Sequence, residues 1–432
     1  MPRIQPQLFW QGRKNLGLNA AKLLPVCRTL ESTANELRWI KQHVAETPSI
    51  IPFGARVWKL CDRRGKGLPL AYVLGNQPFG DLEIKCRPGV LIPRTETESY
   101  TMHLSNILRR SLSSSKSESD QHQHQPLNII DLCTGTGCIP LLLYSQLSRS
   151  LPLQSLNIVG VDISQKAINL SRQNLHHNLH AHRFPRPSSP GDKSHPQRSL
   201  HFHKADIFSP TSLDPILSTP SLSSTSSSSS SSSSTGTGIG TGTGEWDLLT
   251  SNPPYISPSG FALSTSRSVR NWEPKLALVP PVARVELHQK HFYDHYYPDN
   301  EILLQTVEYQ EEDVFYARLL EIARTYRPKR VLMEVGDMEQ AKRVVGMVLG
   351  DGKLRGLYFG NGEVTRGGNE RGAGAGAVQI WRDDLVGFEG YEEIMEVGVG
   401  VDGQKQTIVV KGHPEGHGRS VYLRRVGVVD DV

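Results

Sequence analysis

The fold of this 432-residue chain follows from the stretch Asn128-Ile129-Ile130-Asp131-Leu132-Cys133-Thr134-Gly135-Thr136-Gly137. Its first five residues are mostly apolar and predict a buried strand. The glycines allow a tight turn in which the backbone can approach a ligand, and residues 139–147 predict a helix. Strand, glycine-rich loop and helix in this order indicate a parallel α/β unit. A G-x-G alone is a weak signal, because a plain tight turn explains it equally well.

The alternation of strand and helix continues along the chain. We expect a strand at 156–161 and then a helix at 164–176, which Ser164 can cap. The further strands are expected at 200–208, 246–250, 330–335 and 377–381, and the further helices at 311–325 and 338–349. Such alternation predicts a mostly parallel sheet with helices on both faces. A ligand then lies beyond the carboxyl ends of the strands.

Two of these predicted strands end in an acidic residue. Asp162 follows Val159-Gly160-Val161, where a carboxylate can accept both hydroxyls of a ribose. Asp206 and Ile207 follow the next strand, where the acid can bond an adenine amino group and the isoleucine can pack on the ring. Taken singly, Asp162 is equally well a helix cap and Asp206 part of a strand-end turn.

A third strand end carries the turn Asn252-Pro253-Pro254-Tyr255. Each proline fixes its own φ and favours extended geometry in the residue before it, so the turn is rigid. The Asn252 side-chain oxygen and nearby backbone carbonyls can then accept both N–H bonds of a planar NH2 group. The Tyr255 ring offers a face beside them. The turn therefore predicts transfer to an amide or amino nitrogen.

Composition excludes several other classes of protein. The chain has 48 basic and 43 acidic residues, and its net charge of +5 neither requires nor excludes a nucleic-acid partner. The five cysteines show no C-x-x-C spacing, so we expect neither a disulfide framework nor a zinc site. The histidines at 122–124 and 176–182 lie in polar surroundings without a carboxylate or cysteine framework, so no metal is expected. No apolar run is long enough to span a bilayer.

The chain divides into segments of different composition. We predict a helical domain at 1–68, a connecting hairpin with extended pieces at 69–92, and the main α/β domain at 93–390. Polar, low-complexity inserts are expected near 111–125, 179–200 and 218–244, the last being a serine run followed by Thr-Gly repeats. Such inserts need not break the domain, because loop-closure entropy grows only logarithmically with length. Residues 391–432 are expected to form a C-terminal tail or hairpin, with strands at 408–411 and 420–424.

The first thirty residues are basic and contain no acid. Arg3, Arg13, Lys14, Lys22 and Arg28 give this segment the character of a mitochondrial transit peptide. The alternative is that residues from 19 onward form the first helix of the N-terminal domain. The segment also lacks the serines usual in a transit peptide.

The strand-end elements together point to one ligand. We expect an adenosine-containing cofactor at the carboxyl edge of the sheet. The chain has no G-x-x-x-x-G-K-[ST] and no full G-x-G-x-x-G in this loop, so a nucleoside without phosphates fits better than NAD or ATP. S-adenosyl-L-methionine is such a cofactor. The residues expected to bind it are Cys133, Thr134, Gly135, Thr136, Gly137, Asp162, Asp206, Ile207 and Asn252.

The chain resembles the HemK/PrmC family of release factor glutamine N5-methyltransferases, in the mitochondrial, fungal-like form. The resemblance rests on five stretches in family order, namely 69–75, 91–98, 131–137, 252–256 and 273–278, and it covers about residues 20–385. The stretch Pro93-Arg94-Thr95-Glu96-Thr97-Glu98 is its most specific part. The Asn-Pro-Pro-Tyr turn is less specific, because adenine methyltransferases also use it.

The resemblance implies a fold and a reaction. The fold is a Rossmann-like class I S-adenosylmethionine-dependent methyltransferase domain beside a small N-terminal helical domain. The reaction is methylation of the side-chain amide nitrogen of the glutamine in a Gly-Gly-Gln motif. Its protein substrate is a peptide-chain release factor in the mitochondrion, with the cytoplasm as the alternative location. Neither a membrane nor a nucleic acid is required as a partner.

The resemblance also implies roles for the residues of the turn. Asn252, Pro253 and Tyr255 are the expected catalytic residues, and Asn252, Pro253, Pro254, Tyr255 and Arg94 are expected to bind the substrate. For Arg94, Glu96 and Glu98 an ion pair with only a structural role is an equal alternative. N6-adenine methylation of DNA or RNA remains the alternative reaction, since an exocyclic amine fits the same turn.

The sequence departs from the family pattern at two positions. Cys133 stands where the family has the first glycine of the cofactor loop, and Thr95 stands where a proline is usual. Because cysteine is small, we expect it to hold the turn at negative φ and to leave cofactor binding intact. The distance from Gly137 to Asp162 is also longer than usual, which we attribute to a loop at 151–155.

Overall fold

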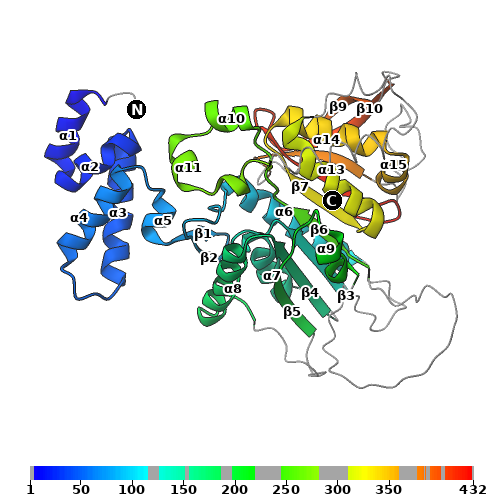
Figure 1. The fold of residues 1–432 in the computed structure, drawn as a ribbon, viewed down its shortest axis with the longest axis horizontal. Helices are drawn as coiled ribbons and strands as arrows, with labels where there is room; N and C mark the ends of the chain where they lie inside the picture. The colour runs from blue at the N-terminus through cyan, green and yellow to red at the C-terminus, as the bar shows by residue number, and fades with distance from the viewer. Residues whose placement is uncertain are drawn as a thin grey trace.

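The computed structural model shows an N-terminal group of helices beside a larger α/β domain (Figure 1). The residues that it describes are 4–114, 126–150, 155–185, 197–218, 245–281, 310–359, 377–383, 385, 390–399 and 404–430. Among these residues, no helix combines the length and the apolar content needed to cross a bilayer.

The N-terminal helices share one apolar core. These helices are α1 (Pro6–Leu16), α2 (Leu18–Cys27), α3 (Leu30–Glu46) and α4 (Phe53–Gly65). Leu23 on α2 and Ile40 on α3 are fully buried and pack with Val57 on α4. Since α2 supplies part of this core, residues 18–27 belong to the folded domain. We expected the first helix of this domain to begin near residue 19, whereas α1 precedes α2.

The connection between the two domains is partly helical. We expected extended structure around 72–75, and this is wrong: Leu70–Leu74 forms the short helix α5. Pro69 precedes its first residue, and Gly75 ends it with φ 81°, a left-handed conformation that favours glycine. A hairpin of β1 (Asn76–Phe79) and β2 (Leu82–Lys85) follows, as expected.

The main domain is built on a nine-stranded sheet of order β5-β4-β3-β6-β7-β11-β8-β10-β9. The first five strands in this order are parallel to one another. Their bounds are β3 (Pro126–Leu132), β4 (Ser155–Asp162), β5 (Gln197–Lys204), β6 (Leu248–Ser251) and β7 (Arg330–Glu334). The strand expected at 200–208 thus ends at Lys204, and a turn closed by the hydrogen bond from the Ser209 amide to the Asp206 carbonyl follows it.

Helices cover both faces of this sheet, which confirms the predicted fold class. Neighbouring residues of a strand point to opposite faces. Ile130 on β3 accordingly packs with α13 and α14, whereas Ile129 packs with α6 and α7. The first face carries α9 (Pro210–Leu217), α13 (Val314–Tyr326), α14 (Met338–Gly350) and α15 (Gly352–Tyr358), and the second carries α6 (Thr95–Ser114), α7 (Cys138–Ser150) and α8 (Gln165–His180).

Short helices and the ends of longer elements fill the rest of the described chain. The short helices are α10 (Pro258–Leu263), α11 (Arg267–Trp272), η1 (Lys275–Ala277) and η3 (Glu311–Asp313). The predicted inserts are partly structured at their edges, because α6 runs to Ser114, α8 ends at His180 and β5 begins at Gln197. Residues 115–125, 186–196 and 219–244 lie outside the described residues, as do 151–154 of the loop expected before β4.

The C-terminal segment is part of the central sheet. We expected strands at 408–411 and 420–424 to pair as a terminal hairpin, and this is wrong. The strand β11 (Gly418–Arg424) lies antiparallel between β7 and β8 (Ala377–Arg382). The strand β10 (Gln404–Lys411) pairs with β8 on its other side and with β9 (Glu392–Val399). The position between β7 and β8 buries Val421, Tyr422 and Leu423 on both faces of the sheet, which an isolated hairpin could not do.

The place of β11 predicts a strong effect of a small change near the C-terminus. Leu423→Ala should lower the free energy of unfolding by about 2–5 kcal/mol, because Leu423 is fully buried. Val426→Ala, three residues later and 41% exposed, should change it by less than about 0.5 kcal/mol. Urea denaturation of both variants measures the difference. Similar small effects of the two substitutions would contradict the central position of β11.

Candidate active site

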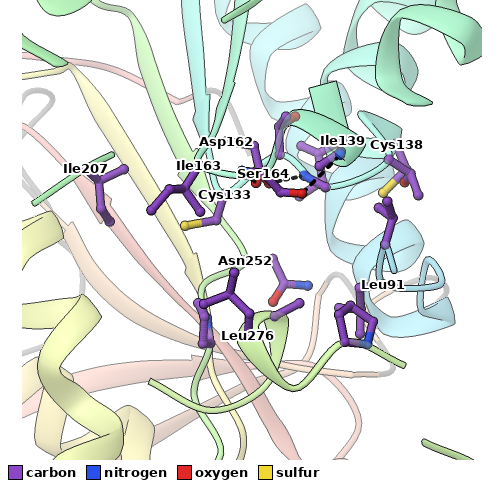
Figure 2. A pocket seen from close by; sticks show the side chains of 18 of the residues that line it. Leu91, Cys133, Cys138, Ile139, Asp162, Ile163, Ser164, Ile207, Asn252 and Leu276 are labelled. Carbon is purple, nitrogen blue, oxygen red and sulfur yellow. Dashed lines mark hydrogen bonds between the residues drawn. The ribbon is translucent and has the colours of Figure 1, made fainter. Parts of the chain in front are cut away.

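The carboxyl ends of the parallel strands surround a cavity (Figure 2). Residues 133–136 after β3, 162–164 after β4 and 205–208 after β5 line it on one side. Asn252 lies between these segments and Leu276, which belongs to the segment after the Asn-Pro-Pro-Tyr turn. Residues 89–94, which lead into α6, close the cavity on a further side.

The glycine-rich loop presents backbone to this cavity. Gly135 has φ 56°, and a β-carbon built on it would have no heavy atom within 4 Å outside its immediate neighbours. Gly137 has a different role, since a β-carbon there would lie 2.9 Å from Ser171 and 3.0 Å from Phe202. Gly135 therefore leaves room for a ligand, while Gly137 lets the loop pack tightly against α8 and β5.

Cys133 does not adopt the conformation that we expected. Its φ is 64°, so the prediction of a negative φ is wrong. The left-handed conformation costs a residue with a β-carbon about 1–2 kcal/mol, which explains why glycine suits this position. The thiol lines the cavity, and burial, with the nearby Asp162 carboxylate, holds its pKa well above its usual range. Cys133 is therefore protonated at neutral pH and contributes shape to the cavity.

Asp162 is held in place by two backbone N–H groups. The amide of Gly135 donates to Oδ2 at 2.9 Å, and the amide of Ser164 donates to Oδ1 at 2.8 Å. Burial raises the pKa of the carboxyl, and these two hydrogen bonds lower it. Each oxygen keeps a further lone pair, so the carboxylate can accept two hydroxyls in the cavity.

The next strand end supplies an apolar wall. Asp206 lines the cavity together with Ile207 and Phe208, and its Oδ1 accepts the amide of Phe208 at 3.0 Å. Ile163 lines the cavity beside Asp162 and leaves 45% of its surface uncovered. Apolar side chains next to two carboxylates are the surroundings that an adenosine requires.

The Asn-Pro-Pro-Tyr turn is only partly in the cavity. Asn252 and Pro254 line it, whereas Pro253 is buried and does not. Tyr255 is also absent from the lining: its hydroxyl donates to Oε1 of Glu334 at 3.1 Å, and its ring packs on the main core. The structure thus brings the Asn252 side chain to the cofactor loop and turns the Tyr255 hydroxyl away from it.

Arg94 forms an ion pair, the alternative role that its sequence context leaves open. Its Nη2 lies 2.9 Å from both carboxylate oxygens of Glu273, whose side chain is buried. The amide of Ile92 donates to the same carboxylate. Arg94 also lines the cavity. The ion pair therefore joins two distant stretches of the chain at the rim of the cavity. Glu96 and Glu98, on the first turn of α6, do not line the cavity.

Two further residues were missed by reasoning from the sequence. Thr97 lines the cavity and lies 3.4 Å from Nδ2 of Asn252. Glu334 is buried at the end of β7 and accepts the hydroxyl of Thr97 at 2.6 Å. A signal for Glu334 existed, since an acid follows the apolar run Val331-Leu332-Met333 as Asp162 follows its own strand.

Comparison with known proteins assigns the family. No family model matches the chain. The mitochondrial MRF1 N(5)-glutamine methyltransferase MTQ1 of Saccharomyces cerevisiae is 33% identical over 281 residues, which are 65% of this chain and 68% of that protein. This chain belongs to the glutamine N5-methyltransferase family. The probable mitochondrial MRF1 methyltransferase mtq1 of Schizosaccharomyces pombe is 30% identical over 259 residues, 59% of this methyltransferase and 66% of the relative.

Similarity to solved structures is more distant. The hMettl16 catalytic domain, solved in complex with the MAT2A 3'UTR hairpin 1, is 13% identical to the methyltransferase. The match covers 92% of the methyltransferase and 91% of the hMettl16 chain. The TM-score is 0.38, too low to support any conclusion about function. The family assignment therefore rests on the sequence relatives.

The cavity of the methyltransferase fits S-adenosylmethionine. Asp162 can hold the ribose, the side chains of Ile163 and Ile207 can cover the adenine, and the open space over Gly135 admits the methionine part. The predicted cofactor is thus consistent with the side chains present.

The role of Asp162 predicts a loss of cofactor affinity. Asp162→Asn should weaken binding of S-adenosylmethionine at least about tenfold, because each hydrogen bond to a charged group contributes roughly 1.5–3 kcal/mol. Isothermal titration calorimetry measures the dissociation constant. The matched control is Glu339→Gln, an exposed carboxylate on α14, which should leave it unchanged. Unaltered affinity of Asp162→Asn would remove Asp162 from the cofactor site.

Proposed function

We propose that the enzyme methylates the side-chain amide nitrogen of the glutamine in a Gly-Gly-Gln motif of a peptide-chain release factor. The observation that carries this proposal is the position of Asn252 in the cavity, opposite Asp162 and the glycine-rich loop (Figure 2). The names of both yeast relatives, which state this chemistry and the substrate MRF1, support it.

S-adenosylmethionine, when bound, supplies an electrophilic methyl group on a sulfonium. An amide nitrogen attacks it poorly, because its lone pair is delocalised over the carbonyl. The enzyme's main contribution is therefore positioning, which can supply on the order of 7–11 kcal/mol of the barrier. The glutamine nitrogen bonds the methyl carbon as the carbon–sulfur bond breaks, which leaves the cofactor as a neutral thioether, and the nitrogen then releases one proton to solvent.

Asn252 is the residue that orients the acceptor. Its Oδ1 accepts an N–H bond of the glutamine amide. This acceptor aims the nitrogen lone pair at the methyl group and stabilises the positive charge that develops on nitrogen. Pro253, which is buried and does not line the cavity, keeps the turn rigid. Pro254 packs beside the acceptor in the cavity. Tyr255, whose hydroxyl bonds Glu334, supports the turn from behind.

The reaction is tested directly with labelled S-adenosylmethionine. The full chain is incubated with a release-factor domain that contains Gly-Gly-Gln or with a nucleic-acid duplex, and the methyl group is located by mass spectrometry. We expect label on the glutamine. Label on adenine and none on glutamine would replace the proposal with the N6-adenine reaction.

The role of Asn252 makes a separate prediction. Asn252→Ala should abolish methyl transfer and keep the affinity for S-adenosylmethionine within about tenfold, since the side chain acts on the acceptor. Asn169→Ala, on the exposed side of α8, is the matched control and should keep full activity. A fully active Asn252→Ala enzyme would contradict the assigned role.

We infer that the enzyme works in mitochondria. The mitochondrial names of both yeast relatives and the basic segment 1–30 support this location. Because Leu23 and Leu24 on α2 are buried in the N-terminal core, any cleaved leader should end before Leu18.

Import of the full chain into isolated mitochondria tests both the location and the cleavage site. We expect a protease-protected product that retains α2, which N-terminal sequencing will show. A chain left outside the organelle would contradict the location, and cleavage after Leu18 would contradict the structural role of α2.

A further inference from the structure

Glu334 accepts three hydroxyl groups from two distant parts of the chain. Its Oε2 accepts the hydroxyls of Thr97 at 2.6 Å and Tyr100 at 2.8 Å, both from α6. Its Oε1 accepts the hydroxyl of Tyr255 at 3.1 Å. The side chain is 2% exposed, so these contacts replace the water that a carboxylate normally holds.

The contact between Glu334 and Thr97 determines what Thr97 can offer on its other side. A threonine hydroxyl has one proton and two lone pairs. Because an ionised carboxylate only accepts, the proton of Thr97 is used in the 2.6 Å bond to Glu334. Thr97 Oγ1 therefore presents only lone pairs to Asn252, whose Nδ2 lies 3.4 Å away.

We propose that Glu334 and Thr97 form a hydrogen-bond relay that fixes which end of the Asn252 amide faces the acceptor nitrogen. This inference rests on the proposed function and adds two positioning residues to it. With Nδ2 turned toward Thr97, the opposite end of the amide is Oδ1, the atom needed to accept an N–H bond. A flipped amide would set Oδ1 against the lone pairs of Thr97 and offer N–H groups to the NH2 of the substrate.

The same carboxylate also holds the other end of the turn. Tyr255 bonds Glu334 directly, and Asn252 is held to it through Thr97. Burial is the larger effect on the pKa of Glu334 and raises it above its usual value, against the hydroxyls of Thr97, Tyr100 and Tyr255, which lower it. All three hydroxyls donate to the carboxylate, which is the arrangement of a group that only accepts. The turn from Asn252 to Tyr255 is consequently held at both ends by the Glu334 carboxylate, at one end directly and at the other through Thr97.

Substitutions at Thr97 test the relay. Thr97→Val keeps the shape and removes the hydroxyl, so kcat should fall at least about tenfold, because a small misplacement of the acceptor is costly. Thr97→Ser restores the hydroxyl and should return kcat to within about threefold of the wild type. The affinity for S-adenosylmethionine should stay within about threefold in both variants.

Thr101→Val is the matched control for the loss of a buried hydroxyl. Thr101 lies one turn further along α6, is fully buried, and donates its hydroxyl to the backbone carbonyl of Thr97 at 2.6 Å. Its kcat should stay within about twofold of the wild type, even if its melting temperature falls. If the Thr97 hydroxyl only stabilised the fold, Thr97→Val and Thr101→Val would both lose activity in proportion to their loss of stability. That result, or a fully active Thr97→Val enzyme, would overturn the proposal.

A measurement on Asn252 itself separates the relay from the choice of substrate. In protein labelled with 15N-asparagine, the side-chain signal that is lost in Asn252→Ala identifies Asn252. This signal should shift in Thr97→Val and Glu334→Gln, and stay in place in Thr97→Ser and Thr101→Val. If the wild-type enzyme fails to methylate the Gly-Gly-Gln domain, the proposed function fails while this readout still decides the relay. An unmoved Asn252 signal in Thr97→Val would refute the relay alone.

Discussion

The site depends on a constraint of parallel sheets, in which the carboxyl ends of all strands meet at one edge. In this enzyme β3, β4, β6 and β7 bring Gly135, Asp162, Asn252 and Glu334 to that edge from positions up to 199 residues apart. No local sequence pattern could hold these groups together. The sheet supplies the scaffold, and the short hydrogen bonds between strand ends set the final positions.

Two layers of interactions complete the site around that edge. The cofactor side is held by backbone: Gly135 and Ser164 both donate to Asp162. The acceptor side is held by side chains, because α6 contributes Thr97 and Tyr100 to the carboxylate at the end of β7. The ion pair of Arg94 with Glu273 closes the rim between them. Through Thr97 and Tyr100, the helix α6 therefore connects the N-terminal half of the enzyme to the part of the cavity around Asn252.

The sequence allowed most of the parallel sheet to be predicted, because its strands are short apolar runs that end in acids or glycines. Asp162, Asp206 and Asn252 could be named from this pattern, since strand ends share an edge. The relay could not, because the link between Thr97 and Glu334 spans 237 residues and depends on side-chain geometry. The left-handed conformation of Cys133 was missed because cysteine itself gives no signal for a positive φ, although the glycine that the family has at this position does.

The position of β11 has a consequence for the order in which the enzyme can be completed. Its partners β7 and β8 are synthesised well before residues 418–424, yet neither has its full set of backbone hydrogen bonds until β11 lies between them. A nascent chain that lacks these residues has two facing strand edges without their common partner, and such edges are prone to pair with other chains. The catalytic domain thus acquires a continuous sheet only after residues 418–424 have left the ribosome, so β7 and β8 depend for their protection on a strand that is made later than either of them.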